Sequence, residues 1–260
     1  MELPIYQVDA FADAVFRGNP ASVCPLESWL SEETMQAIAA ENNQSETAFL
    51  VPAGDGYEIR WFTPVVEIDL AGHPTLAAAH VIFTILDPSR AEIRFESRRS
   101  GALVVTRKQG RLVMDFPSHP PEPRDDLGDV AGALGAPPAE VLAARDGVAV
   151  FETEQQVRAL APDMTRVAAL RVFGLIATAP GEACDFVSRF FAPGAGIPED
   201  PVTGSAHCTL TPYWAKRLGK NALHARQVSC RGGDLYCRLD GERVEIAGEA
   251  VLYMEGRIHI

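Results

Sequence analysis

The sequence predicts an α+β protein of two similar lobes, each a curved, barrel-like and mostly antiparallel sheet around one central buried helix. Three observations carry this prediction. Short runs rich in Val, Ile, Phe and Tyr, bounded by Gly, Asp or Pro, recur along the chain as strands do. Residues 74–86 are apolar nearly all round, as a helix buried on every side must be. Four features recur in the same order in both halves.

Length, charge and composition exclude several classes of protein. The chain has 260 residues, enough for one or two domains, and is 47% hydrophobic and 22% charged, which is typical of a globular protein. The formal net charge of -12 argues against a nucleic-acid partner and against binding to a membrane of anionic lipid. A small anionic substrate stays possible, because a few helix N-termini can hold one.

The compartment is indicated by the N-terminus and the cysteines. The first residues, MELPIYQVDAF, lack the basic and apolar regions of a signal peptide. The five cysteines are odd in number and far apart, which favours free thiols over disulfides. We therefore expect a cytoplasmic protein.

The strands are expected wherever a short β-branched or aromatic run is bounded by turn residues. Residues 91–116 give three runs joined by tight turns, which indicates an antiparallel meander, and residues 225–260 give a second one. The predicted strands are 5–11, 47–51, 57–62, 91–97, 101–107, 111–116, 170–178, 184–191, 225–230, 234–240, 243–248 and 250–256.

Helices are expected at 31–42 and 153–170, each ahead of an Arg-aromatic motif, and at 74–86 and 204–218 as the two central helices. Pro212 should kink the last of these. Each half repeats the order helix, apolar strand, Arg-aromatic-Phe-small-Pro motif, and central helix. The motif is Arg60-Trp61-Phe62-Thr63-Pro64 in the first half and Arg189-Phe190-Phe191-Ala192-Pro193 in the second, which indicates an internal duplication.

A proline-rich segment, Pro117-Ser118-His119-Pro120-Pro121-Glu122-Pro123, is the expected boundary between the lobes, since neither a helix nor a central strand can run through it. The predicted lobes are residues 1–117 and 118–260, and the sequence leaves open whether the C-terminal strand returns to the first lobe.

The starts of the central helices are the first candidate site. Pro74 suits the first position of a helix, which makes His73 the expected N-cap after Gly72. Ser205 is the expected N-cap of the second central helix, after Gly204. If the lobes are related by a twofold, these two positive helix ends could hold a carboxylate substrate between them. The alternative is that both glycines merely cap buried helices.

Two acidic residues lie in polar turns. Glu46 follows Asn42-Asn43-Gln44-Ser45 between a helix and a strand, where a solvent-exposed side chain is the ordinary alternative. Asp200 precedes the second central helix, where ordering of the local backbone is the alternative. His80 and His207 are read as structural. No cluster has metal-ligand spacing and no glycine run has the context of a nucleotide fingerprint, so we predict neither a metal nor a cofactor.

Four segments of the chain resemble the PhzF-like family, the phenazine-biosynthesis isomerases and their relatives. They are YQVDAFADAVFRGNPASVCPL, ENNQSETAFL, IRWFTPVVEIDLAGHPTLAAAH and FFAPGAGIPEDPVTGSAHC, and the match covers nearly the whole chain in order. The resemblance implies the diaminopimelate-epimerase-like fold, with an active site between two lobes, and a homodimer. Phenazine synthesis itself is not implied, because it describes few members.

The resemblance also implies roles for particular residues. Glu46 matches the family's general acid/base, and its supporting polar positions are matched by His73, Asp200 and Ser205. Gly72 and Gly204 match the helix-start positions that approach the substrate. Epimerases of the wider fold use two cysteines, but Ala71 and Pro201 stand beside the helix starts here and Cys208 lies further along, so a two-thiol mechanism is not expected.

The expected function is therefore cofactor-independent isomerisation, in which Glu46 moves a proton on a small unsaturated carboxylic acid and changes a double bond or a keto–enol pair. Two alternatives stay open. One is a metabolite-binding or interaction protein of the same fold without turnover. The other is epimerisation of an amino-acid-like substrate.

Overall fold

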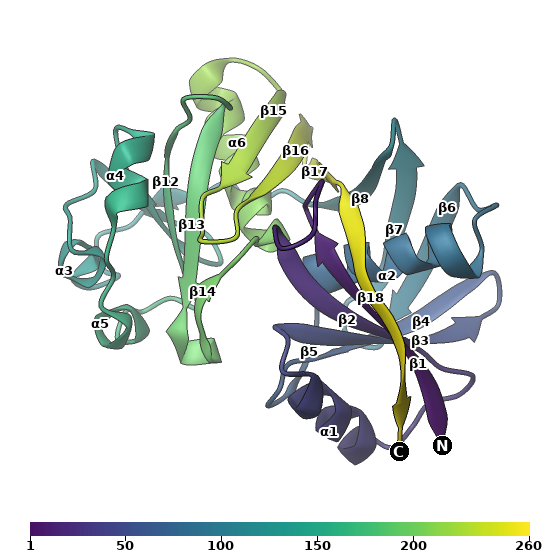
Figure 1. Ribbon diagram of the computed structural model, residues 1–260. Helices are drawn as coiled ribbons and strands as arrows, with labels where there is room; N and C mark the ends of the chain where they lie inside the picture. Colours follow the sequence, from purple (N-terminus) through teal and green to yellow (C-terminus); the bar gives the residue numbers. More distant parts are fainter. The chain divides into compact units, whose positions relative to one another are not determined.

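The computed structural model describes residues 1–260, and the chain divides into two compact units (Figure 1). The first unit comprises Met1–Asp115 together with Ala247–Ile260, and the second comprises Phe116–Ile246. The chain therefore leaves the first unit just before the proline-rich segment and re-enters it for its last strand.

The first unit is a mixed, mostly antiparallel sheet. Antiparallel pairs join β1 to β2, β1 to β18, β3 to β4, β4 to β5, β6 to β7 and β7 to β8, whereas β2–β3 and β4–β6 are parallel. The strands are β1 (Glu2–Ala10), β2 (Asn19–Pro25), β3 (Glu46–Ala53), β4 (Gly56–Phe62), β5 (Glu67–Ile68), β6 (Glu92–Ser97), β7 (Gly101–Lys108), β8 (Arg111–Pro117) and β18 (Ala250–His259).

The central helix of this unit is α2 (Gly72–Val81), which continues as a π-helical turn, η1 (Ile82–Leu86). Every residue from His73 to Ala79 is buried. The apolar run at 74–86 is thus a core helix, as its lack of a polar face predicts. The surface helix is α1 (Glu32–Asn42), whose N-cap Ser31 accepts a hydrogen bond from the Thr34 amide.

The second unit repeats this pattern of pairing. β10–β11 is antiparallel, β11–β12 parallel, β12–β13 antiparallel, β13–β15 parallel and β15–β16 antiparallel, and these match β1–β2, β2–β3, β3–β4, β4–β6 and β6–β7. The strands are β9 (Glu122–Pro123), β10 (Glu140–Ala143), β11 (Gly147–Val150), β12 (Leu175–Pro180), β13 (Phe186–Ala192), β14 (Ile197–Asp200), β15 (Ala222–Gln227), β16 (Gly233–Asp240) and β17 (Arg243–Gly248).

The central helix of the second unit is α6 (Gly204–Leu218), with ten buried residues. Pro212 lies inside it and cannot donate to the carbonyl of Cys208 one turn earlier. That carbonyl instead accepts a hydrogen bond from the His119 amide at 3.0 Å, so the proline leaves no helix carbonyl of this turn without a donor. The smaller helices are α3 (Val130–Leu134), α4 (Glu154–Ala159), α5 (Met164–Ala168) and the 3₁₀ turn η2 (Pro193–Ala195).

The prediction of one helix over 153–170 is wrong, because this segment forms two short helices, α4 and α5. α4 ends at Ala159, and Asp163 begins α5 as a new N-cap whose carboxylate accepts the Thr165 and Arg166 amides. Pro162 between them explains the break, since the residue before a proline is pushed out of the helical region. The sequence did not predict the helix α3 or six of the strands, which are β2, β5, β9, β10, β11 and β14.

Candidate active site

Glu46 is buried. It is the first residue of β3, aligned with Ala21 of the parallel strand β2, and only 6% of its surface is exposed. Asn43 ends α1 in the left-handed conformation, with φ at 49°, and turns the chain from helix to strand within three residues. The alternative of an exposed turn residue is therefore wrong for Glu46.

His73 lies beside this carboxylate. It is the second residue of α2, and its Nε2 lies 3.0 Å from Oε2 of Glu46, with both side chains under 10% exposed. The two atoms are close enough for a hydrogen bond, but neither makes one, so Oε2 of Glu46 is buried without an aligned donor. A buried carboxylate oxygen in this condition is a candidate proton acceptor.

Two residues that sequence reasoning missed complete this cluster. Asn19, at the start of β2 and fully buried, places its Nδ2 3.1 Å from Nδ1 of His73. Ser45 donates its hydroxyl to Oδ1 of Asn19 at 3.2 Å. The available signal was weak: a polar residue between Gly18 and Pro20, inside one of the segments that carries the family resemblance.

Asp200 ends β14 and is 7% exposed. Its Oδ2 accepts the Thr203 hydroxyl at 2.5 Å. Fully buried Gln227 donates to the Asp200 carbonyl at 2.6 Å and accepts the Thr203 amide at 2.8 Å. Asp200 thus orders the local backbone, as its turn position suggested, and Gln227 is a further residue that the sequence did not point to. Half-buried Ser205 follows as the second residue of α6.

The helix starts differ from expectation by two residues. The N-caps are Ala71 and Thr203, both extended, and the helices begin at the glycines. His73 and Ser205 therefore lie in the first helical turn rather than at the cap, and Pro74 is the third helical residue, where its missing amide is still no loss. Neither Gly72 nor Gly204 has a positive φ, so backbone conformation alone does not require glycine at either position.

The two central helices have no side-chain N-cap, unlike the other α-helices. Neither Ala71 nor Thr203 makes a side-chain cap to its helix, and the Thr203 hydroxyl is turned to Asp200 instead. A helix start without a capping side chain keeps its amide dipoles for another partner. Side-chain caps are present at α1, α3, α4 and α5, from Ser31, Asp129, Thr153 and Asp163.

Burial raises the pKa of four of the five cysteine thiols, those of Cys24, Cys184, Cys208 and Cys237. All five are free, and burial raises the pKa of the Cys208 thiol to about 12. No group of three or more His, Cys, Asp or Glu side chains is placed to hold a metal ion. None of the helices combines the length and the apolar character needed to cross a bilayer.

The structure thus brings the predicted residues into two sets. Glu46, His73 and Gly72 lie together in the first unit, and Asp200, Gly204 and Ser205 lie together in the second. Each set combines a buried carboxylate with a central helix start that lacks a side-chain cap, which suits proton transfer next to a bound anion.

Comparisons with known proteins agree on one family. The sequence profile described as phenazine biosynthesis-like protein matches residues 8–256. A protein of Pseudomonas aeruginosa named an uncharacterized isomerase is 54% identical over 261 residues, covering 100% of both chains. A PhzF family crystal structure from Enterococcus faecalis has a TM-score of 0.97 at 48% identity, covering 100% of both chains. A hydroxyproline epimerase from Agrobacterium vitis shares the fold, with a TM-score of 0.62 at 9% identity over 99% of this chain and 92% of that one.

Proposed function

The chain belongs to the phenazine biosynthesis-like family of isomerases, and we propose that it moves a proton within a small unsaturated carboxylic acid without a cofactor. The observation that carries this proposal is the buried Glu46 carboxylate, whose Oε2 lacks an aligned donor and lies 3.0 Å from His73. A carboxylate held out of water is well placed to take a proton from carbon and return it.

The proposed step conserves all atoms and electrons. Glu46 removes a proton from a carbon conjugated with the substrate's double bond, and the C–H electron pair shifts to give a dienolate. The protonated Glu46, whose carboxyl proton exchanges in part with solvent, then delivers a proton to another carbon, or to the carbonyl oxygen, on the same face. The double bond or the keto–enol pair has moved, and the enzyme is unchanged.

The remaining residues stabilise the charge that develops in this step. Anion binding falls to the starts of α2 and α6, which have no side-chain cap. Each of these helices begins at a glycine, Gly72 in the first unit and Gly204 in the second, whose missing Cβ permits close approach of the backbone to a bound anion. In the first unit, His73 would donate to the developing enolate. In the second unit, Ser205 would donate to a bound anion, and Asp200 would hold the start of α6 in place through Thr203.

The test of this proposal is proton exchange in D₂O. A panel of short α,β- and β,γ-unsaturated carboxylates is incubated with the protein, and deuterium incorporation and double-bond position are followed by NMR. We expect Glu46→Gln to lower the exchange rate by at least about 100-fold, the usual contribution of a general base. The control is Glu33→Gln, an exposed residue of α1, which should exchange at the wild-type rate.

Other outcomes discriminate the alternatives. Full activity in Glu46→Gln would remove that residue from the mechanism. Saturable binding of a carboxylate without any exchange would favour a metabolite-binding protein. Exchange at an α-carbon with loss of chirality, and no double-bond shift, would favour an amino-acid-like epimerase. The homodimer that we propose rests on the family resemblance, and light scattering tests it. The cytoplasmic location that we propose rests on the five free, widely spaced cysteines.

A further inference from the structure

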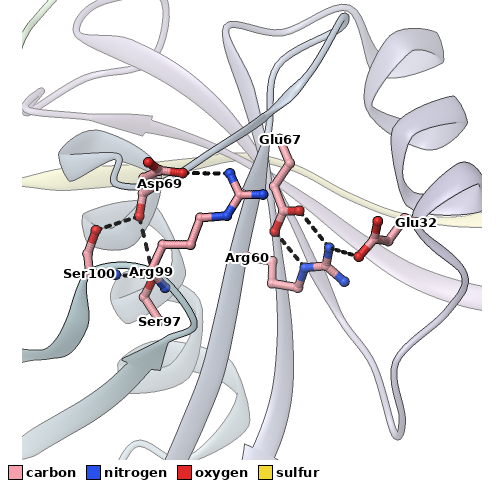
Figure 2. A network of polar contacts seen from close by, with 7 residues as sticks. All are labelled: Glu32, Arg60, Glu67, Asp69, Ser97, Arg99 and Ser100. Atoms are coloured by element: carbon pink, nitrogen blue, oxygen red, sulfur yellow. Dashed lines mark hydrogen bonds and ion pairs between the residues drawn. The ribbon is translucent and has the colours of Figure 1, made fainter.

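The motif shared by the two halves holds a buried arginine in each unit. In the first unit the Arg60 side chain is 3% exposed and binds Glu67 through two parallel hydrogen bonds, Nε to Oε1 at 2.7 Å and Nη2 to Oε2 at 2.6 Å (Figure 2). The same guanidinium reaches Glu32 at the start of α1, at 2.8 Å. The bonds from Arg60 hold the pKa of the Glu67 carboxyl below its ordinary value. A forked pair of this kind fixes orientation as well as charge.

The second unit contains the same pair. Arg189 binds Glu199 with Nε to Oε1 at 2.7 Å and Nη2 to Oε2 at 3.0 Å, and its side chain is 12% exposed. Its remaining nitrogen, Nη1, donates to the carbonyl of Leu160 at 2.8 Å, just after α4. Each arginine thus ties its glutamate to a surface helix of the same unit.

Both glutamates lie on the short segment that enters a central helix. Glu67 is on β5 and precedes Gly72 by five residues, and Glu199 is on β14 and precedes Gly204 by five. Strand pairing makes the two segments equivalent, because Ile68 pairs with Trp61 as Asp200 pairs with Phe190. We call these segments, 67–71 and 199–203, the connectors.

Each connector is also held at a second point. Ser100, after β6, donates its hydroxyl to the Asp69 carbonyl at 2.7 Å (Figure 2). Ser229, after β15, donates to the Pro201 carbonyl at 2.7 Å. Both carbonyls lie three residues before the helix glycine. Two matched anchors on five residues leave each connector little freedom.

We propose that the two Arg–Glu pairs are positioning residues, a role that rests on the proposed function. Each pair fixes a connector and thereby sets where the central helix begins, so that Arg60–Glu67 orients His73 and the pair in the second unit orients Ser205. Neither pair needs to touch the substrate to affect the rate, because a shift of about 1 Å at a reacting group can lower a rate by about 100-fold.

The test uses Glu67→Gln and Glu199→Gln in the full chain. Glutamine keeps the size of the side chain but loses the charge and one arm of the fork. Amide hydrogen exchange is measured by NMR, together with the ¹⁵N shifts of the His73 ring. We expect exchange to rise about tenfold at the start of α2 in Glu67→Gln and at the start of α6 in Glu199→Gln, each confined to its own helix, as expected of local opening. The His73 ring shifts should move only in Glu67→Gln.

The matched control is Glu154→Gln. Glu154 is 10% exposed and pairs with Arg158 at 2.6 Å, but it starts α4 and lies on neither connector. It should change neither helix start. The proposal is overturned if both connector variants fold and show wild-type exchange at the first hydrogen-bonded amides of the two helices, residues 75–79 and 207–211, or if Glu154→Gln accelerates the same amides.

A charge-retaining variant provides a second measurement. Arg60→Lys keeps a cation but loses the fork, and we expect its exchange and ring shifts to lie between those of wild type and Glu67→Gln. Where the wild type turns over a carboxylate, the connector variants should lower kcat more than they raise KM. Failure of the proposed function is seen separately, because it depends on Glu46→Gln turnover, whereas the connectors are tested by exchange without any substrate.

Discussion

Asn19 decides which nitrogen of His73 carries the proton. The Ser45 hydroxyl occupies Oδ1 of Asn19, which leaves the amide nitrogen facing Nδ1 of His73 at 3.1 Å. An amide nitrogen can only donate, so the network assigns Nδ1 as acceptor and places the proton of the neutral ring on Nε2. That nitrogen faces Glu46. Glu46, the proposed acid/base residue, thus has a neighbour whose donor nitrogen is fixed by a residue on the adjacent strand.

Exchanging the amide for a carboxylate tests this assignment. In Asn19→Asp the group facing Nδ1 accepts rather than donates, so the ring should carry its proton on Nδ1. We expect the ¹⁵N shifts of the ring to change to that pattern and the proton-exchange rate in D₂O to fall by about 10- to 100-fold, as expected when a base is wrongly oriented. Ser45→Ala should have a smaller effect, since it removes only the contact to Asn19. Unchanged ring shifts in Asn19→Asp would show that another contact sets the tautomer.

Among the elements, the two central helices lack the stabilisation of a side-chain N-cap, which leaves their first amides without a capping oxygen. Every other α-helix has a side-chain cap, but Ala71 and Thr203 give none. A missing cap typically lowers stability by about 1 kcal/mol per helix. Both uncapped helices are the ones that carry candidate site residues, which is where stability is often given up for function.

Ala71→Ser should reverse that trade in the first unit. Ala71 already has the extended backbone of an N-cap, with φ at -138° and ψ at 121°, so a serine there can accept an amide of the first turn. We expect the free energy of unfolding in urea to rise by about 0.5 to 1 kcal/mol. Deuterium exchange into a carboxylate substrate should fall, because the serine hydroxyl now occupies a first-turn amide that would otherwise bind the substrate anion. Ser31→Ala is the opposite control, with lower stability and unchanged exchange. A serine variant with wild-type exchange would contradict anion binding at this helix start.

The elements were predictable where the local pattern decides them. The central helix at 74–86 follows from its all-round apolar surface, and the meander at 91–116 follows from three short β-type runs joined by tight turns. β2 was missed because Pro20 and Pro25 make it look like a loop, and its parallel pairing with β3 is long-range information. The burial of Glu46 depends on that pairing, so local sequence placed it in a turn and only the family resemblance marked it as functional.

For the whole molecule, the duplication was visible in the Arg-aromatic-Phe-small-Pro motif, and the strand pairing of both units repeats it. The purpose of the motif could not be derived from its letters. Arg60 and Arg189 act through glutamates that differ in distance along the chain, seven residues in one case and ten in the other. The spacing between arginine and glutamate therefore does not show that the two glutamates are equivalent. Their equivalence is seen in their distance from the central helix, because each lies five residues before its first glycine.

The pH dependence of the fold is set in part by two buried groups of the second unit that act in opposite directions. Burial lowers the pKa of His207 to about 4, and its Nε2 has no hydrogen-bond partner. The unfolded chain binds a proton at this histidine below about pH 6.5, and the native state does not until about pH 4, so stability is lost as the pH falls through that window. Burial raises the pKa of Asp146 to about 6, so between that pH and 3.8 the native state holds the extra proton and stability is lost as the pH rises.

Replacing either residue should leave the pH dependence that the other contributes to stability without its opposing effect. In Asp146→Asn the unfolding free energy should fall more steeply than in wild type as the pH drops from 6 to 4, by up to about 1.4 kcal/mol per pH unit. In His207→Gln, which can still donate to the Thr203 carbonyl that now accepts Nδ1 at 2.8 Å, the acid loss should be weaker than in wild type. Urea unfolding at several pH values, followed by circular dichroism, measures both slopes. Parallel curves for wild type and His207→Gln would mean that this histidine is protonated in the native state as readily as in the unfolded chain, and that the core around α6 admits the charge.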